Sequence, residues 1–304
     1  MVNKPTPDAA HGSFRIRVVM AFFATYILWG TTFLAIRVAV EELPPLLAAG
    51  LRFFTAGVLL YAFMRWRGQP GPSAPQWRNL AIMGVLMFVA EYGPLFWAEK
   101  YVPSGIASVF AATLPITTMV LEMLVLRQQR FRWTVLFATL LGFCGVGALL
   151  LPNGRQHFDL LPCAAILAGA TSWSLGAVLS RSMELPKSRP LTAGAAMMLG
   201  GGILLVLSAA FGEMNPLPHI SLRAGLAVLY LIVCGSLLGF TAFIWLLAHM
   251  PATRVASHAY VNPIVAVALG YFAAGEAVTL RTLAGTGLVL ASVFLILHSG
   301  TSKT

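Results

Sequence analysis

The segment WAEKYVPSGIASVFAATLP (97–115) returns later in the chain as WLLAHMPATRVASHAYVNP (245–263), with its tryptophan and both prolines at an offset of 148. Two more sets of landmarks recur at offsets of 144 and 145: Trp29 and Arg37 as Trp173 and Arg181, and Pro45 and Gly57 as Pro190 and Gly202. Each half holds five helix-length apolar stretches. Because five is odd, the second half must begin on the opposite side of a membrane from the first.

Composition places the chain in a bilayer. Of its 304 residues, 58% are hydrophobic and only 10% are charged, against about 25% charged in average soluble domains. The net charge of +10 is scattered among short loops rather than gathered on one face, so no nucleic-acid partner is expected. The three cysteines lie in apolar runs and are read as packing residues.

A membrane span needs about 20 apolar residues, and the chain offers ten such stretches. They are predicted near residues 18–40, 44–64, 79–99, 103–126, 132–151, 159–180, 190–212, 224–248, 252–274 and 278–298. The predicted fold is an all-α integral membrane protein with ten transmembrane helices in two inverted five-helix repeats. Its parts are an N-terminal tail (1–17), a first repeat (18–151), a second repeat (159–298) and a C-terminal tail (299–304).

Charged loops predict the orientation. With the N-terminus in the cytoplasm, the outer side holds only five of the 20 lysines and arginines: Arg37, Lys100, Arg155, Arg223 and Arg281. Because cytoplasmic loops are enriched in these residues, both termini are expected to be cytoplasmic. The polar, basic first 17 residues lack the apolar core of a cleaved signal peptide.

Glu91 is the foremost candidate among the few charges inside spans, because such charges usually face a cavity or a partner. One reading makes it a substrate ligand or a carrier of a coupling proton. The other makes it a neutral carboxyl, or one paired with Arg52, that joins two spans. Arg52 itself is read as structural, since its repeat counterpart is Met197.

The ninth span holds a polar cluster of three side chains, His258, Tyr260 and Asn262, just before Pro263. Proline cannot donate to the helix ladder, so a kink is expected here and at the equivalent Pro115. Kinked spans at matching places in two halves are typical of transporter binding sites. The cluster is therefore read as substrate-binding, with His258 a second candidate proton carrier. Interhelical hydrogen bonding is the alternative.

Five aromatic residues inside spans could wall a cavity, a feature that suits planar, apolar or cationic solutes. They are Trp29, Tyr92, Trp97, Trp173 and Trp245, of which all but Trp245 are predicted substrate-binding residues. Ordinary packing would also repeat in both halves and remains the alternative. No phosphate-binding loop, metal-ligand spacing or nucleophile–base pair is present, so no ATP, metal, cofactor or enzymatic activity is expected.

The chain resembles the EamA type of the drug/metabolite transporter superfamily. The resemblance rests on five motifs: ILWGTTF (27–33), PPLLAAGLRF (44–53), VPSGIAS (102–108), SWSLG (172–176) and YVNPIVAV (260–267) followed by GE (275–276). It implies ten helices, a place in a bacterial inner membrane and a central cavity among the first, third, fourth, sixth, eighth and ninth spans. Trp29, Trp173, Tyr260 and Asn262 match motif positions, whereas Glu91 and Tyr92 rest on the physical argument alone.

The predicted function is secondary active transport. A small metabolite, amino acid or drug would leave the cytoplasm by alternating access, with the lipid bilayer as surroundings and a proton gradient as the candidate driving force. The alternative is a membrane scaffold or assembly partner without transport activity, and an intramembrane enzyme is a weaker third reading. The inverted repeat argues against the scaffold, which does not require it.

Overall fold

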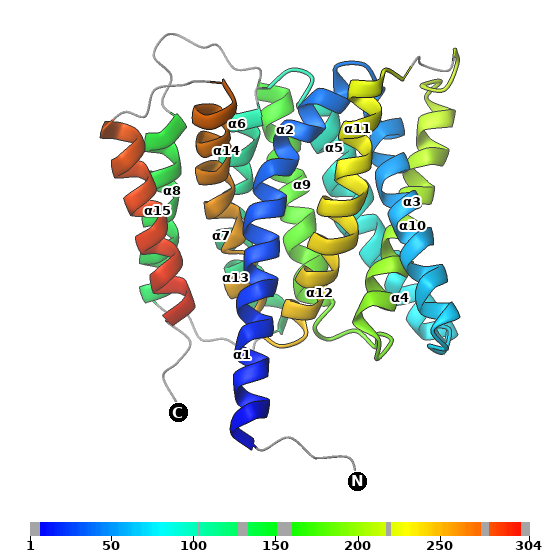
Figure 1. The fold of residues 1–304 in the computed structure, drawn as a ribbon, viewed down its shortest axis with the longest axis horizontal. Helices are drawn as coiled ribbons and strands as arrows, with labels where there is room; N and C mark the ends of the chain where they lie inside the picture. The colour runs from blue at the N-terminus through cyan, green and yellow to red at the C-terminus, as the bar shows by residue number, and fades with distance from the viewer. Residues whose placement is uncertain are drawn as a thin grey trace.

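The computed structural model describes residues 7–102, 104–126, 133–150, 160–216, 220–274 and 280–298. Within these ranges every regular element is a helix, which confirms the all-α class (Figure 1). Six of the described helices are long and apolar enough to cross a membrane: Phe14–Val40, Pro45–Trp66, Ala74–Ala98, Leu160–Ser180, Arg189–Ala210 and Leu222–Leu247. Parts of the predicted tails, residues 1–6 and 299–304, lie outside the described residues.

Several predicted spans consist of two or three consecutive helical segments. The first half comprises α1 (Pro7–Phe23), η1 (Ala24–Leu28), α2 (Trp29–Val40), α3 (Pro45–Trp66), α4 (Ala74–Gly84), η2 (Val85–Val89), α5 (Ala90–Ala98), α6 (Ser104–Ala111), α7 (Leu114–Leu121), η3 (Glu122–Leu126) and α8 (Trp133–Leu150). The second half comprises α9 (Leu160–Leu179), α10 (Arg189–Ala210), α11 (Leu222–Tyr230), η4 (Leu231–Phe240), α12 (Thr241–Leu247), α13 (Ala252–Val255), α14 (His258–Ala274) and α15 (Leu280–His298). The η segments are π-helical. Helix α1 begins at Pro7, well before the predicted start of the first span at residue 18.

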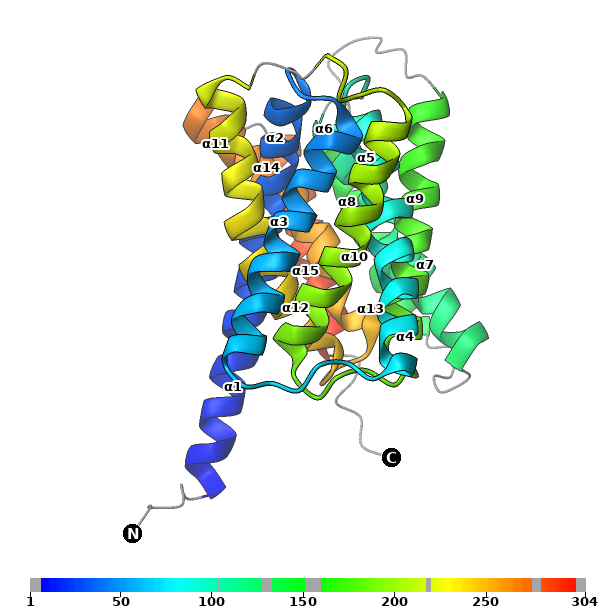
Figure 2. The ribbon, with the colours of Figure 1, turned by 90° about the vertical axis from the view of Figure 1, so that its right-hand side faces the viewer.

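Helices α3 and α10 pack along each other at one lateral edge of the bundle (Figures 1 and 2). Glycines make this approach possible. A Cβ atom on Gly57 would lie 2.2 Å from the backbone nitrogen of Met198, and one on Gly201 would lie 2.2 Å from that of Phe54. Small residues let the backbones of membrane helices meet in this way. The contact therefore depends on the absence of side chains at these two positions.

Helices α8 and α15 form a second close pair at the opposite lateral edge of the bundle (Figure 1). A Cβ atom on Gly145 would lie 2.9 Å from the carbonyl oxygen of Gly285. The hydroxyl of Ser292 donates a 2.7 Å hydrogen bond to the Ala138 carbonyl across the pair. The remaining helices, including α2, α5, α9, α12 and α14, fill the space between the two pairs (Figures 1 and 2).

The fourth and ninth predicted spans are interrupted. In the fourth, α6 ends at Ala111 and α7 begins at Leu114, so Pro115 lies in the first turn of α7, where proline is well tolerated. In the ninth, the interruption falls between Val255 and His258 and Pro263 lies inside α14.

The interruption in the ninth span falls several residues before the position at which Pro263 alone would kink a helix. Local hydrogen bonding at Ser257 accounts for it. Its hydroxyl donates to the Arg254 carbonyl at 2.7 Å and bonds the Tyr26 hydroxyl at 2.8 Å. Such bonds compete with the regular helix ladder.

Candidate substrate cavity

A small cavity of about 40 Å³ lies among helices from both halves of the chain. Its walls include six of the eight side chains predicted to bind substrate: Trp29, Glu91, Tyr92, Trp173, His258 and Asn262. The other lining residues are mostly apolar: Thr32, Phe33, Ile36, Leu95, Ala111 and Leu114. The structure thus brings together residues from α2, α5, α6, α7, α9 and α14 that lie far apart in the sequence.

Trp29 is the aromatic centre of this cavity. Its ring centroid lies 5.6 Å from that of Trp173 and 4.7 Å from that of His258, edge-on in both cases. Its indole N–H donates a 2.8 Å hydrogen bond to the carbonyl of Gly235 in the π-helical segment η4. Because π-helical geometry loosens the backbone ladder, η4 can offer this carbonyl to a neighbouring helix. The bond fixes the face that Trp29 turns to the cavity.

Three polar side chains in the cavity wall have buried atoms without a hydrogen-bond partner among the described residues. These atoms are Oε2 of Glu91, both ring nitrogens of His258 and Oδ1 of Asn262. Glu91 is 8% exposed, and the other two side chains are 3% exposed each. Leaving such groups unpaired is costly in an apolar interior. Polar groups that are kept despite this cost in a membrane protein usually serve a function.

Gly169 on α9 makes room for the Glu91 carboxylate. A Cβ atom at this glycine would stand 2.7 Å from Oε2 of Glu91 and 3.1 Å from the Glu91 carbonyl oxygen. The carboxylate is therefore held between α5 and α9, beside the cavity. Nothing in the sequence around Gly169 or Glu91 predicts this contact.

Arg52 does not pair with Glu91 among the described ion pairs. Its Nε donates a 3.0 Å hydrogen bond to the hydroxyl of Ser236, and its guanidinium lies 4.5 Å from the ring centroid of Phe53 and 5.0 Å from that of Tyr92. Tyr92 lines the cavity and Arg52 does not. Arg52 thus lies over the rings of Phe53 and Tyr92, and the alternative in which it pairs with Glu91 is not found among the described ion pairs.

Two predicted site residues lie elsewhere. The ring of Trp97 packs on that of Tyr101, with 5.3 Å between centroids, near the end of α5. The Tyr260 hydroxyl donates a 3.3 Å hydrogen bond to the Thr139 carbonyl, and its ring belongs to a separate apolar cluster with residues of α8 and α15. Neither side chain lines the cavity, so their predicted role in binding remains a prediction without support from this geometry.

Comparison with known proteins adds the family. The sequence matches the EamA-like transporter family over residues 16–151 and again over residues 160–298. This chain belongs to the EamA-like transporter family. The family predicted from the sequence motifs is thereby confirmed.

Two curated relatives of this EamA chain span nearly its whole length. It is 35% identical over 282 residues to the inner membrane transporter YedA of Escherichia coli (strain K12), a match that covers 91% of this chain and 89% of YedA. It is 28% identical over 280 residues to a probable amino-acid metabolite efflux pump of Salmonella typhimurium, covering 88% of this chain and 91% of the pump. A solved structure with 20% identity shares the fold at a TM-score of 0.74, covering 91% of this chain and 95% of its own.

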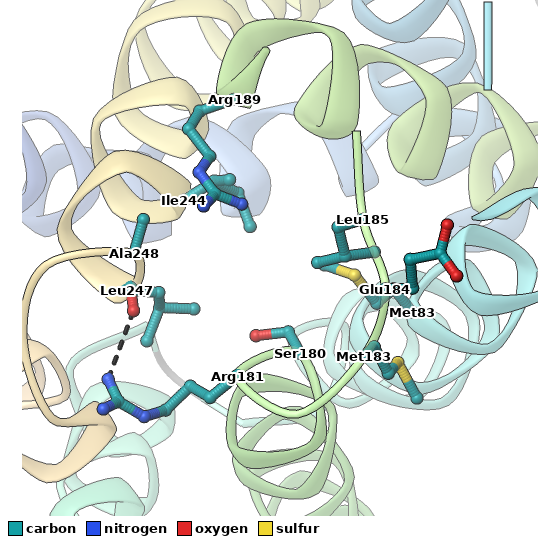
Figure 3. Close-up of a pocket in the computed structure, with 10 residues that line it drawn as sticks. All are labelled: Met83, Ser180, Arg181, Met183, Glu184, Leu185, Arg189, Ile244, Leu247 and Ala248. Atoms are coloured by element: carbon teal, nitrogen blue, oxygen red, sulfur yellow. Dashed lines mark hydrogen bonds between the residues drawn. The ribbon is translucent and has the colours of Figure 1, made fainter. Parts of the chain in front are cut away.

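A larger cavity of about 360 Å³ opens at one end of the EamA bundle, between the end of α9, the start of α10 and the end of α12 (Figure 3). Arg181, Glu184 and Arg189 give it a charged rim, and Met83, Ile244 and Leu247 are among its apolar walls. Its residues include none that line the small cavity. We call this larger cavity the vestibule; of the helices that line the small cavity, α9 also borders the vestibule.

Arg181 ties the helix ends around this vestibule. It donates hydrogen bonds to the Leu247 carbonyl at 3.2 Å (Figure 3) and to the Met250 carbonyl, and its Nε lies 3.9 Å from the Glu122 carboxylate. Glu122 also accepts hydrogen bonds from the backbone N–H of Ala252, at 2.8 Å, and from the Thr253 hydroxyl, at 2.6 Å. One buried carboxylate thus joins α13 to the end of α7 and to Arg181.

Phe243 is a member of the site that the sequence alone did not single out. Its ring lies 5.0 Å from that of Trp29, 5.1 Å from that of Trp173 and 5.8 Å from that of His258. The next residue, Ile244, lines the vestibule. One signal could have found it: at the repeat offset of 148, Phe243 corresponds to Leu95, which lines the small cavity.

Proposed function

We propose that this protein is a secondary active exporter that carries a small metabolite, amino acid or drug out of the cytoplasm by alternating access. The observation that carries the proposal is the small cavity between the two halves, with unpartnered buried atoms on Glu91, His258 and Asn262. A scaffold has no need of such groups. The description of a relative as a probable amino-acid metabolite efflux pump supports the export of small solutes.

Ten spans in two inverted halves are part of the same proposal. Two hydrogen bonds support it: Arg37 donates to the carbonyl of Glu99, and Arg181 donates to the carbonyl of Leu247. Arg181 follows Arg37 by 144 positions and Leu247 follows Glu99 by 148, the offsets of the repeat landmarks. The first bond lies at the end of the bundle where α2 ends, and the second at the opposite end, where α12 ends (Figure 1).

We propose further that both termini face the cytoplasm of a bacterium and that the bundle crosses its inner membrane. The N-terminal end of α1 and the C-terminal end of α15 lie at the same end of the bundle (Figure 1). The relative YedA is described as an inner membrane transporter, and the lysine and arginine bias of the loops supports a cytoplasmic position for that end. The vestibule beside Arg181 then faces the cytoplasm.

Cysteine accessibility tests alternating access. In a chain whose native Cys144, Cys163 and Cys234 are replaced, cysteine is introduced at Leu114 or Asn262, which both line the small cavity, and labelled from each side of the membrane. We expect labelling at both positions from both sides, because each state exposes the cavity to one side. A cysteine at Leu290, which is 55% exposed on α15, serves as the lipid-facing control. Labelling of the two cavity positions from neither side would contradict the proposal.

Removing the Arg181 contacts should favour the state in which the small cavity is open on the side of the vestibule. Arg181→Ala deletes hydrogen bonds that join the ends of α9 and α12. Hydrogen bonds made by charged groups contribute about 1.5–3 kcal/mol, so we expect labelling at position 262 from the vestibule side to rise about 10-fold. The control is Arg189→Ala, which removes another arginine from the same rim. Equal rates in both variants and the parent would show that Arg181 does not close this end.

A further inference from the structure

We propose that the small cavity binds the ammonium group of an organic cation whose remaining body is apolar. The inference rests on the proposed transport function and narrows the class of solute. It starts from the chemistry of the unpartnered atoms. When the Glu91 carboxyl is ionised, its Oε2 is an acceptor, as Oδ1 of Asn262 is, so a ligand that satisfies both must bring hydrogen-bond donors. His258 can add one donor and one acceptor when its ring is neutral.

The charge of the wall indicates a cation. Glu91 is the one acidic residue among the described residues that line the cavity, and no lysine or arginine lines it. A carboxylate buried in a membrane protein is stable only when it is protonated or has a counter-ion. An ammonium group supplies the counter-ion and up to three donors. A free carboxylate on the ligand would instead be repelled by Glu91 and would meet no cationic side chain in the wall.

Arg52 does not change this conclusion. Its Nε is bonded to Ser236 and its guanidinium lies over the rings of Phe53 and Tyr92, while its Nη1 has no hydrogen-bond partner among the described residues. Its side chain is not part of the cavity wall. A zwitterionic amino acid would therefore gain a partner for its ammonium group and no cationic partner in the cavity wall for its carboxylate.

The uncharged part of the wall selects the rest of the ligand. Trp29, Trp173 and Tyr92 present aromatic rings, which attract cations through their faces. Phe33, Ile36 and Leu95 are apolar. Because the indole N–H of Trp29 is already bonded to Gly235, it offers no further donor to a ligand. A volume of about 40 Å³ fits an ammonium head group, and the apolar body must extend along these side chains as the helices part.

A matched series of probes tests the inference on the purified full-length protein in lipid nanodiscs. The four probes share a phenyl ring and differ in charge: 2-phenylethylamine is a cation, 2-phenylethanol is neutral, 3-phenylpropionate is an anion and phenylalanine is a zwitterion. Binding is measured by calorimetry and by quenching of tryptophan fluorescence. We expect the amine to bind roughly 10-fold or more tightly than the alcohol, the effect of a hydrogen bond to a charged group, and the other two to bind more weakly still.

Glu91→Gln keeps the shape of the side chain and removes its charge. We expect it to weaken amine binding by the same factor and to leave binding of the alcohol unchanged. The control is Glu41→Gln, at a surface ion pair with Arg223, which should change neither. Tighter binding of the anion, the zwitterion or the alcohol by the parent protein, or binding of none of the four, would overturn the inference without any variant. Unchanged amine binding in Glu91→Gln would do the same.

These outcomes are separate from those of the transport proposal. The binding measurement does not require transport, and the cysteine labelling does not require a known solute. Selective amine binding without labelling from either side would leave the ammonium site in place and remove alternating access. Labelling from both sides with preference for the zwitterion would keep the transporter and overturn the cationic class.

Discussion

Gly201→Ala should prevent most of the protein from folding in membranes, whereas Gly202→Ala, one position further along the same helix, should leave it folded. The difference lies in what each new methyl group meets. At Gly201 it would lie 2.2 Å from the backbone nitrogen of Phe54, and at Gly202 it would lie 3.6 Å from the nearest atom of the Phe54 ring. A backbone atom cannot turn away as a side chain can, so α3 and α10 must separate along the contact.

The expected loss is large because overpacking costs about 1–3 kcal/mol even where side chains can adjust, and here the obstacle is the main chain. Folded protein is measured by gel filtration after extraction and by resistance to unfolding in a denaturing detergent. Gly202→Ala is the matched control for the added methyl group and for the higher helix propensity of alanine. Equal yield and equal resistance of the two variants would show that α3 and α10 do not approach as closely as described.

Glu91→Gln should abolish any dependence of transport on a pH gradient. The amide has the shape of the carboxyl but cannot take up or release a proton. No other acidic side chain lines the described part of the small cavity, so none is placed to substitute for it. The measurement is uptake of solute into proteoliposomes with and without an imposed pH gradient. The parent should respond to the gradient, and the variant should show the same rate in both conditions.

Two further variants make this result specific. Glu41→Gln removes a carboxylate from a surface ion pair and should retain the full response. His258→Gln tests the second candidate carrier, whose ring nitrogens are also unpartnered in the cavity wall. A response to the gradient that persists in Glu91→Gln would remove Glu91 from the coupling step. Loss of the response in His258→Gln, with the response kept in Glu91→Gln, would assign the coupling step to His258 on α14.

Hydropathy predicted the all-α class and the six long apolar helices of the described residues, because apolar length is a property of each segment by itself. It could not predict where the ninth span is interrupted, because the break depends on Ser257, whose hydroxyl bonds both the preceding turn and Tyr26 of the first span. Nor could it predict the tight α3–α10 contact in detail, since that contact pairs individual glycines with backbone atoms of a distant helix.

The sequence predicted part of the candidate cavity, because some of its residues carry a signal of their own and others are defined only by their contacts. Repeated landmarks and unusual polar residues led to Trp29, Glu91, Trp173, His258 and Asn262, all of which line it. Tyr260 stands two positions from both His258 and Asn262, and side chains two apart on a helix point in different directions. Phe243 carries no polar signal, and its correspondence to Leu95 at the repeat offset of 148 does not by itself predict its contact with Trp29.

The two halves do not contribute the same chemistry to the cavity. Glu91 belongs to the first half, where its counterpart in the second is Gly239, and a Cβ atom there would meet the Trp29 indole at 2.5 Å. His258 and Asn262 belong to the second, opposite Phe110 and Leu114 in the first. Two copies of either half alone would therefore bring together two acids or none. The two EamA matches of this chain are therefore not interchangeable at the small cavity, because the acid comes from the first and the imidazole and the amide come from the second.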